Sequence, residues 1–217
     1  MTAGNFISFD TESGFMTDAD DVLDATGVVL AGGESRRFGE DKALYTVDGE
    51  PLIQRPIACL EALCSSVSII AKHPATYKPF GVPVVEDGYE QQMPHVGVLT
   101  GLEATETEWS VFLACDMPSI TPDVVRTLYE ARVGDENGAS VQAVVPETPS
   151  GVHPLAAWYH RSAAEALRTA IAEEWSLRGW LSEISTRVVS FEDEEPFRNV
   201  NRKEDLPAGD RRADAQS

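Results

Sequence analysis

Short apolar runs alternate with amphipathic stretches along the chain, a pattern that predicts strands followed by helices. Strands are predicted where apolar residues fill both faces of a short run, at 27–31, 66–71, 82–86, 110–115, 141–146, 154–159 and 186–191. Helices are predicted where apolar residues recur at helical spacing, at 51–64, 96–105, 121–133, 161–174 and 176–184. The helix at 121–133 has a clear start signal, because Thr121 is followed by Pro122 at the first helical position.

This alternation predicts an α/β fold, a Rossmann-like three-layer α/β/α sandwich around a mainly parallel sheet. The run at 154–159 follows its predecessor with no helix between them, so one or more late strands are expected to be antiparallel. Residues 1–25 show no sustained period and predict a flexible acidic extension, and residues 208–217 predict a flexible tail. A single domain is expected over 26–207.

Acidic residues outnumber basic ones by 36 to 17, which gives a formal charge of −19. Such a surface repels nucleic acid and anionic lipid, so neither is expected as a partner. The same acid-rich, lysine-poor composition is also typical of proteins adapted to high salt, where ions screen the self-repulsion. No apolar run reaches the length of about 20 residues that a membrane span needs, and the acidic N-terminus lacks the basic start of a signal peptide. A cytoplasmic protein is expected, with a monomer favoured.

The three cysteines, Cys59, Cys64 and Cys115, have no metal-ligand spacing and no CxxC pair. Cys59 and Cys64 fall in a predicted helix, and Cys115 ends a predicted strand. We interpret all three as buried thiols in a reducing compartment.

The stretch "VVLAGGESRRFGEDKAL" at 28–44 joins an apolar strand to a loop with little side-chain bulk and much positive charge. Gly32 and Gly33 let the backbone turn tightly and approach a ligand, and N–H groups exposed in such a turn bind anions. Arg37 and Lys42 add full charges to the same loop. The stretch has neither the Gly-Lys-Ser/Thr ending of a P-loop nor a GxGxxG pattern. It therefore predicts a phosphate-binding loop of another type, the alternative being a glycine-rich surface turn with solvated arginines.

This stretch closely resembles the signature LAGGxSxRMGxDKAL of the molybdenum cofactor guanylyltransferases, from which only Phe38 departs, in place of Met. The resemblance extends over residues 27–206. It implies that the backbone of Leu30, Ala31 and Gly32 faces the nucleotide. It also implies that Lys42 holds the phosphates and that Arg37 belongs to the same phosphate loop.

The segment "VFLACDMPSITP" carries Asp116 just after an apolar strand. A carboxylate at a strand end facing a phosphate loop is suited to hold Mg²⁺ between protein and phosphates. The alternative is a carboxylate that caps the turn or the next helix. The resemblance agrees with the metal role, because the family carries a CDxP-like segment whose Asp binds magnesium. Lys42, Arg37 and Asp116 are thus the predicted catalytic residues.

Two further segments match the family in part. Asp87 in "VVEDGYEQQMPHVGVLTGLEA" follows a strand, and Gly97 and Gly101 bracket a helix start, as in a family region whose Asp contacts nucleotide and whose glycines admit the ligand. Here Val98 and Thr100 replace the usual Pro and Ala. The alternative for Asp87 is a turn residue before Gly88.

The second is the late pair "GVHPLAAWY" and "FRNVNRKEDL", which resembles a His-Pro and an NVNTPEDL segment of the family. It implies that His153, Asn199 and Asn201 lie on the side of the second substrate. Arg202 and Lys203 replace the usual Thr and Pro. His153 is predicted to orient a pterin or its phosphate, or else to be a turn histidine, and the asparagines to support the metal site.

The function implied is transfer of GMP from GTP to the molybdopterin cofactor with release of pyrophosphate, with Mg²⁺ as cofactor. Cofactor-delivery proteins are possible partners. In the family an Asn after the second strand recognises the base, but here the corresponding positions are Ile70, Ala71 and Lys72. CMP transfer to the same cofactor, or nucleotidyl transfer to another small phosphate, therefore stays open. A non-catalytic nucleotide-binding or cofactor-chaperone protein is the alternative of another class.

Overall fold

The computed structural model describes residues 7–9, 22–31, 41–47, 49–89, 93–133, 140–200 and 205. Its strands are β1 Ile7–Phe9, β2 Leu23–Ala31, β3 Thr46–Val47, β4 Glu50–Pro51, β5 Cys64–Ala71, β6 Val84–Glu86, β7 Trp109–Ala114, β8 Ala143–Thr148, β9 Gly151–Val152, β10 Ala156–His160 and β11 Thr186–Ser190. Its α-helices are α1 Gln54–Glu61, α2 Pro74–Tyr77, α3 Pro94–Ala104, α4 Pro122–Glu130, α5 Ala164–Ala172 and α6 Leu177–Leu181. Short 3-10 helices are η1 Lys42–Leu44, η2 Lys78–Phe80, η3 Arg161–Ala163 and η4 Glu195–Phe197. All seven predicted strands and all five predicted helices are present among them.

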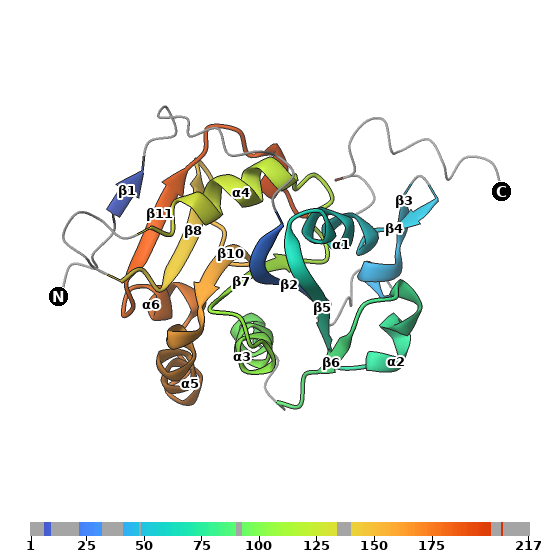
Figure 1. Cartoon of the computed structure of the whole chain (residues 1–217), viewed down its shortest axis with the longest axis horizontal. Helices are drawn as coiled ribbons and strands as arrows, with labels where there is room; N and C mark the ends of the chain where they lie inside the picture. Colours follow the sequence, from blue (N-terminus) through green and yellow to red (C-terminus); the bar gives the residue numbers. More distant parts are fainter. Residues whose placement is uncertain are drawn as a thin grey trace.

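The main sheet has the strand order β1-β11-β8-β10-β7-β2-β5-β6, with β9 paired to β8 (Figure 1). Neighbouring strands are parallel except around β10, which runs antiparallel to both β7 and β8, and in the β8–β9 hairpin. The late antiparallel strand is therefore confirmed. Because β8 and β7 both oppose β10, they run in the same direction and end at the same edge of the sheet as β2 and β5.

Helices cover both faces of the sheet, with α1 and α4 on one side and α3 and α5 on the other (Figure 1). Consecutive strand residues point to opposite faces. Val29, Ile69 and Leu113 accordingly join the buried cluster under α1 and α4, whereas Val28, Ile70 and Phe112 join the cluster under α3, α5 and α6. The predicted three-layer sandwich is confirmed, and the continuous apolar runs of its strands are explained by burial on both faces.

Two helix ends show how local chemistry sets the boundaries. Thr121 caps α4 as predicted, with its side chain accepting a hydrogen bond from the N–H of Val124 and with Pro122 as the first helical residue. The predicted helix at 51–64 ends earlier, at Glu61, because Cys64 already pairs with Leu23 as the first residue of β5. The prediction that Cys64 lies in a helix is thus wrong. Apolar residues continue from the helix into the strand, so the sequence pattern does not mark the boundary between them.

The N-terminal segment differs from the predicted extension in two described stretches. Ile7–Phe9 form β1, which pairs in parallel with β11, and β2 begins at Leu23. The prediction of a flexible chain is wrong for these stretches. The rest of residues 1–25, and the predicted tail at 208–217, lie outside the described residues.

Burial accounts for the cysteines. Cys59 and Cys64 are buried, and removal from water raises the pKa of each thiol to about 12. Cys115 follows β7 directly and is only half-buried, so the predicted full burial holds for Cys59 and Cys64 but not for Cys115. Removal from water, aided by the neighbouring Asp116 carboxylate, still raises the pKa of Cys115. All three thiols stay protonated near neutral pH. In the part of the chain that the structure describes, no helix is long and apolar enough to cross a membrane.

Gly101 is required by the close approach of α3 to the sheet. A Cβ atom there would collide with the ring of Phe112 and lie 3.2 Å from Cγ1 of Val28, both fully buried. We expect Gly101→Ala to lower the free energy of unfolding by about 2 kcal/mol, because overpacking outweighs the better helix propensity of alanine. Urea unfolding measures this difference.

Gly97→Ala is the matched control, four residues earlier in the same helix. Its Cβ would meet only the terminal Cδ2 of Leu30, at 3.2 Å, and that methyl group is able to move. The control should unfold close to the wild-type midpoint. Equal destabilisation by the two changes would contradict the packing argument.

Candidate active site

The candidate site lies at the edge of the sheet where β2, β5, β7 and β8 end. The N–H of Cys115 donates to the carbonyl of Leu30 at 3.1 Å, which brings the segment after β7 against the end of β2. Asp116 therefore lies beside Leu30 and Ala31, the last residues of β2. Ligands of open α/β sheets bind beyond this edge, so the predicted residues near it are in the expected place.

Lys42 and Asp116 form the central contact of the site. Nζ of Lys42 lies 2.7 Å from Oδ2 of Asp116, and only 13% and 17% of the two side chains are exposed. The residues are 74 positions apart in the sequence, and the structure brings them together as the predicted site requires. At this burial the ion pair is screened weakly, so each charge stabilises the other.

The second carboxylate oxygen of Asp116 is buried and has no hydrogen-bond partner in the described part of the chain. A buried, unpaired carboxylate oxygen is costly unless a cation or a donor reaches it. The described residues hold no group of three or more His, Cys, Asp or Glu side chains able to hold a metal ion. A cation here would therefore have Asp116 as its protein ligand and need most of its other ligands from substrate and water.

Asp41 and Tyr77 hold Lys42 in place, and sequence reasoning missed both. Asp41 caps η1, with Oδ1 accepting from the N–H of Ala43 at 3.1 Å and Oδ2 accepting from the hydroxyl of Tyr77 at 2.6 Å. Burial, reinforced by the Asp41 carboxylate, raises the pKa of Tyr77, so the phenol stays a donor. The Asp directly before Lys42 was the available signal for the cap. Nothing in the sequence points to Tyr77, which comes from α2.

The segment before the predicted Asn201 also reaches the site. The N–H of Val200 donates to the carbonyl of Asp116 at 2.9 Å, and the Val200 side chain is buried against Val47 and Leu52. Asn199 directly precedes Val200 and has an exposed side chain. The segment is therefore held against Asp116 by its backbone, and the supporting role of Asn199 stays a prediction.

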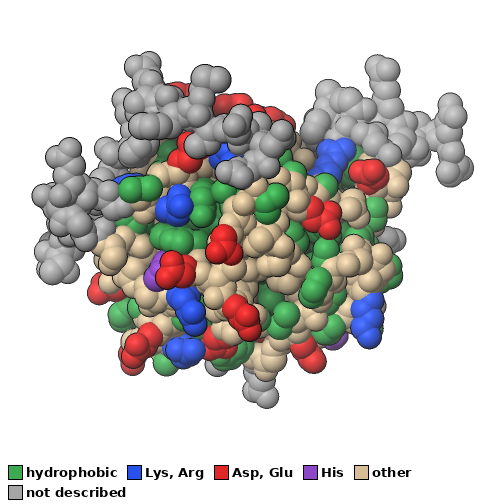
Figure 2. Space-filling view, viewed as in Figure 1, with side chains coloured by type: hydrophobic (Ala, Val, Ile, Leu, Met, Phe, Trp, Pro, Cys, Tyr) green, Lys and Arg blue, Asp and Glu red, His purple; other side chains and the backbone are tan. Residues whose placement is uncertain are grey.

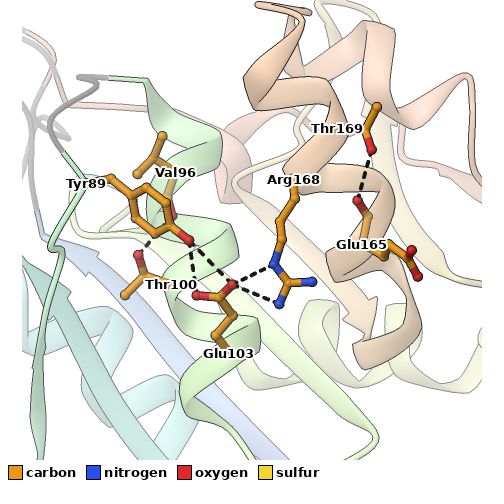
Figure 3. A network of polar contacts seen from close by, with 7 residues as sticks. All are labelled: Tyr89, Val96, Thr100, Glu103, Glu165, Arg168 and Thr169. Carbon is orange, nitrogen blue, oxygen red and sulfur yellow. Dashed lines mark hydrogen bonds and ion pairs between the residues drawn. The ribbon is translucent and has the colours of Figure 1, made fainter.

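Asp87 is anchored to α3 and lies on the opposite side of β2 from Asp116. Its Oδ1 accepts from the N–H of Tyr89 at 3.3 Å and from the hydroxyl of Thr100 at 3.4 Å. The Tyr89 hydroxyl in turn contacts Glu103 at 3.2 Å, and Glu103 pairs with Arg168 of α5 at 2.9 Å (Figure 3). Asp87 is thus part of a network that ties the turn after β6 to two helices.

Two further positions qualify the sequence predictions. Lys72 is one of the three positions that correspond to the family's base-recognising Asn. Its Nζ donates to the carbonyl of Tyr89 at 3.0 Å. Gly101, one of the two glycines expected to admit a ligand, is instead covered by Phe112 and Val28, because it serves helix–sheet packing. Gly97 lies one turn nearer the start of α3, and its Cα faces the Leu30 side chain.

His153 lies at the same edge, just before β10. Its Nε2 is 2.8 Å from Oγ1 of Thr148, and its ring stacks on that of Phe197 with centroids 5.1 Å apart. Burial lowers the pKa of His153, the Arg178 charge lowers it further, and Glu194 opposes both. The imidazole is therefore neutral near pH 7. Two residues on, the carbonyl of Leu155 accepts from the N–H of Ala114, which ties this loop to β7.

Several predicted residues lie outside the described part of the chain. These are Gly32, Gly33 and Arg37 of the phosphate loop, and Asn201. Their predicted roles stay predictions.

The face of the molecule in Figure 2 shows acidic and basic side chains interspersed over the described elements, in keeping with a chain that has few basic residues.

Known proteins resemble this chain over most of its length. The molybdenum cofactor guanylyltransferase of Serratia proteamaculans is 34% identical over 185 residues, which cover 83% of this chain and 91% of that protein. The enzyme of the same name from Desulfosudis oleivorans is 30% identical over 190 residues, covering 83% and 92%. The crystal structure of molybdopterin-guanine dinucleotide biosynthesis protein A from Archaeoglobus fulgidus has a TM-score of 0.69 at 23% identity, covers 85% of this chain and 96% of that one, and shares the fold.

A family model described as the MobA-like NTP transferase domain matches residues 27–188. The match begins in β2 and ends in β11, so it contains the Lys42–Asp116 pair, Asp87 and His153. With this match and relatives of 30% identity or more along most of its length, the chain belongs to the MobA-like NTP transferase family.

Proposed function

We propose that this nucleotidyltransferase moves GMP from GTP to the phosphate of the molybdopterin cofactor and releases pyrophosphate. The observation that carries the proposal is the largely buried Lys42–Asp116 pair at the carboxyl edge of the sheet, with Oδ1 of Asp116 buried and unpaired among the described residues. The names of the relatives supply the substrates, since both curated relatives described above are molybdenum cofactor guanylyltransferases.

In this reaction an oxygen of the acceptor phosphate attacks the α-phosphorus of GTP. The new P–O bond forms while the bond to the bridging oxygen of the β-phosphate breaks, and that electron pair leaves with pyrophosphate. A phosphate monoester is already largely ionised at neutral pH, so no strong general base is needed. The main obstacle is repulsion between the attacking anion and the triphosphate, which makes charge neutralisation and positioning the main tasks of the protein.

The residues at the edge of the sheet suit these tasks. Lys42 brings a cation held by η1 and by the Asp41 cap. Asp116 would hold Mg²⁺ through its unpaired Oδ1, and the bound ion would neutralise charge on the phosphates. Arg37 and the N–H groups of Gly32 and Gly33 are proposed to hold the β- and γ-phosphates. Leu30, Ala31, Asp87 and Gly97 are proposed to line the nucleotide, with His153, Asn199 and Asn201 on the acceptor side.

The experiment is a pyrophosphate-release assay with purified protein, Mg²⁺ and a molybdopterin-loaded acceptor, run with each nucleoside triphosphate in turn. We expect release with GTP and none without acceptor. Release with CTP instead would assign the cytidylyl alternative, which is the relevant comparison because Ile70, Ala71 and Lys72 do not match the base-reading Asn. A protein that binds nucleotide but releases no pyrophosphate with any of them would be a binding or chaperone protein.

A further inference from the structure

We infer that Arg178, His153 and the backbone at Gly151 form a subsite for an anionic phosphate monoester of the acceptor, on the β8 side of Asp116. The inference rests on the proposed nucleotidyl transfer and goes beyond it, because it assigns the acceptor phosphate to residues of α6 and the β8–β9 hairpin. Arg178 is 62 positions after Asp116 in the sequence and belongs to none of the segments that resemble the family signature.

The hairpin projects from the same edge of the sheet as Asp116. Thr148 pairs with Gly151 at its tip, beyond the point where β10 begins. The loop that follows is tied to β7 through the hydrogen bond from Ala114 to the Leu155 carbonyl, 2.9 Å long. The hairpin and Asp116 therefore flank the same stretch of the edge, while Ala31, the last residue of β2, lies on the opposite side of Asp116. An acceptor that attacks opposite the leaving pyrophosphate approaches from the hairpin side.

Glycine at 151 makes room for the guanidinium group of Arg178. A Cβ atom at this position would lie 3.1 Å from Nη2 and 3.9 Å from Cζ of Arg178. Gly151 also has a φ of +116°, in the region that L side chains rarely adopt. At Gly151 the hairpin thus presents only backbone to the guanidinium group of Arg178. A side chain at 151 would displace that group.

The side chain of Arg178 makes no ion pair and no hydrogen bond with any described residue, although acidic residues outnumber basic ones about two to one in this chain. Its side chain is exposed, and its charge is close enough to His153 to lower the pKa of that imidazole. Glu194 is the acidic group near the same imidazole and acts in the opposite sense. An arginine held over a glycine and left without a carboxylate keeps all its donors for a ligand.

His153 supplies a second donor at the same place. Its Nε2 is engaged by the Thr148 hydroxyl at 2.8 Å, and stacking on Phe197 fixes the plane of the ring. Its Nδ1 has no hydrogen-bond partner among the described residues and is not one of their buried unpaired atoms, so it reaches the surface. The subsite requires the tautomer in which Nε2 accepts from the Thr148 hydroxyl, so that the neutral ring carries its proton on Nδ1 and donates it outward.

The chemistry of these groups selects a phosphate monoester. The planar fork of a guanidinium matches two oxygens of a phosphate in a bidentate contact, and an imidazole N–H and backbone groups complete the set. The acceptor of the proposed reaction carries such a phosphate, and its oxygen must come close to the α-phosphorus. The subsite therefore raises the local concentration of the attacking group and orients it.

The test compares Arg178→Gln with Arg161→Gln, a variant with the same loss of charge. Arg161 is exposed and follows β10, whose final residue pairs with the first residue of β7 at the opposite edge of the sheet. In the pyrophosphate-release assay, Arg178→Gln should raise KM for the molybdopterin acceptor about 10- to 100-fold, the loss expected for a charge-assisted contact. KM for GTP should stay unchanged, and Arg161→Gln should leave both constants at their wild-type values. Arg178→Lys should recover only part of the loss, since lysine lacks the fork.

A second measurement does not depend on turnover. Inorganic phosphate is titrated into wild-type protein and into Arg178→Gln while the imidazole resonances of His153 are followed by NMR. Phosphate should shift the His153 signals of the wild type and not those of the variant. If this shift appears while no nucleotide gives pyrophosphate, the proposed function fails and the anion subsite stands. If transfer proceeds but Arg178→Gln keeps the wild-type acceptor KM, or phosphate leaves His153 unmoved, the subsite is wrong.

Discussion

Replacing Asp116 with asparagine should lower kcat for pyrophosphate release about a thousandfold or more, because a loss of roughly 4 kcal/mol of transition-state stabilisation is expected when an ion-binding carboxylate is removed. Asparagine has nearly the same shape as aspartate, so the turn after β7 and the hydrogen bond from Val200 to the carbonyl of residue 116 should persist. What changes is charge. Both the ion pair with Lys42 and the negative charge on Oδ1 disappear.

The metal role is measured separately from the rate. Mn²⁺ is a spectroscopic stand-in for Mg²⁺, and its binding in the presence of GTP should be weakened strongly in Asp116→Asn when followed by electron paramagnetic resonance. Asp123→Asn is the matched control, since Asp123 is exposed in the first turn of α4 and the charge change is the same. Circular dichroism should show both variants folded. Unchanged Mn²⁺ binding together with unchanged kcat would remove Asp116 from the metal site.

The sequence is informative about this site because the chemistry lies at strand ends. Asp116 comes just after one apolar run, and Lys42 belongs to the segment that follows another; parallel strands that end at one edge bring such segments near each other whatever their separation in the chain. That reasoning needs only the direction of the strands. It does not need the order of the strands. Nothing in the sequence indicates that β7, which leads to Asp116, is a direct neighbour of β2.

Contacts that depend on tertiary packing were not predictable in the same way. Tyr77 meets Asp41 only because α2 is folded back toward η1, and Arg178 meets Gly151 only because α6 lies next to the β8–β9 hairpin. Gly101 is a further case, since a glycine inside a helix is compatible with ligand access or with close packing, and the ring of Phe112 decides between them. β1, at Ile7–Phe9, is too short for its period to be recognised.

Lys42→Met should lower kcat/KM for GTP by about 100- to 1,000-fold, the loss typical of one electrostatic group at a transferring phosphate. Methionine keeps most of the length and the apolar stem of lysine, so η1 and the Asp41 cap should remain. The apo protein should also lose about 1–3 kcal/mol of unfolding free energy, because the largely buried Asp116 carboxylate is left without this cation. Lys78→Met, an exposed lysine in η2, is the control for charge alone.

The double variant Lys42→Met/Asp116→Asn separates a structural role of Lys42 from a role at the phosphates. Residues in direct contact are not additive, so the stability lost in Lys42→Met should be largely recovered once the unpaired carboxylate is gone. GTP affinity should not be recovered, because the ammonium that neutralises the triphosphate is still missing. Urea unfolding and GTP titration of the four proteins give both coupling energies. If the affinity returns together with the stability, Lys42 only holds Asp116 in place, and the charge that the triphosphate needs must come from elsewhere in the loop.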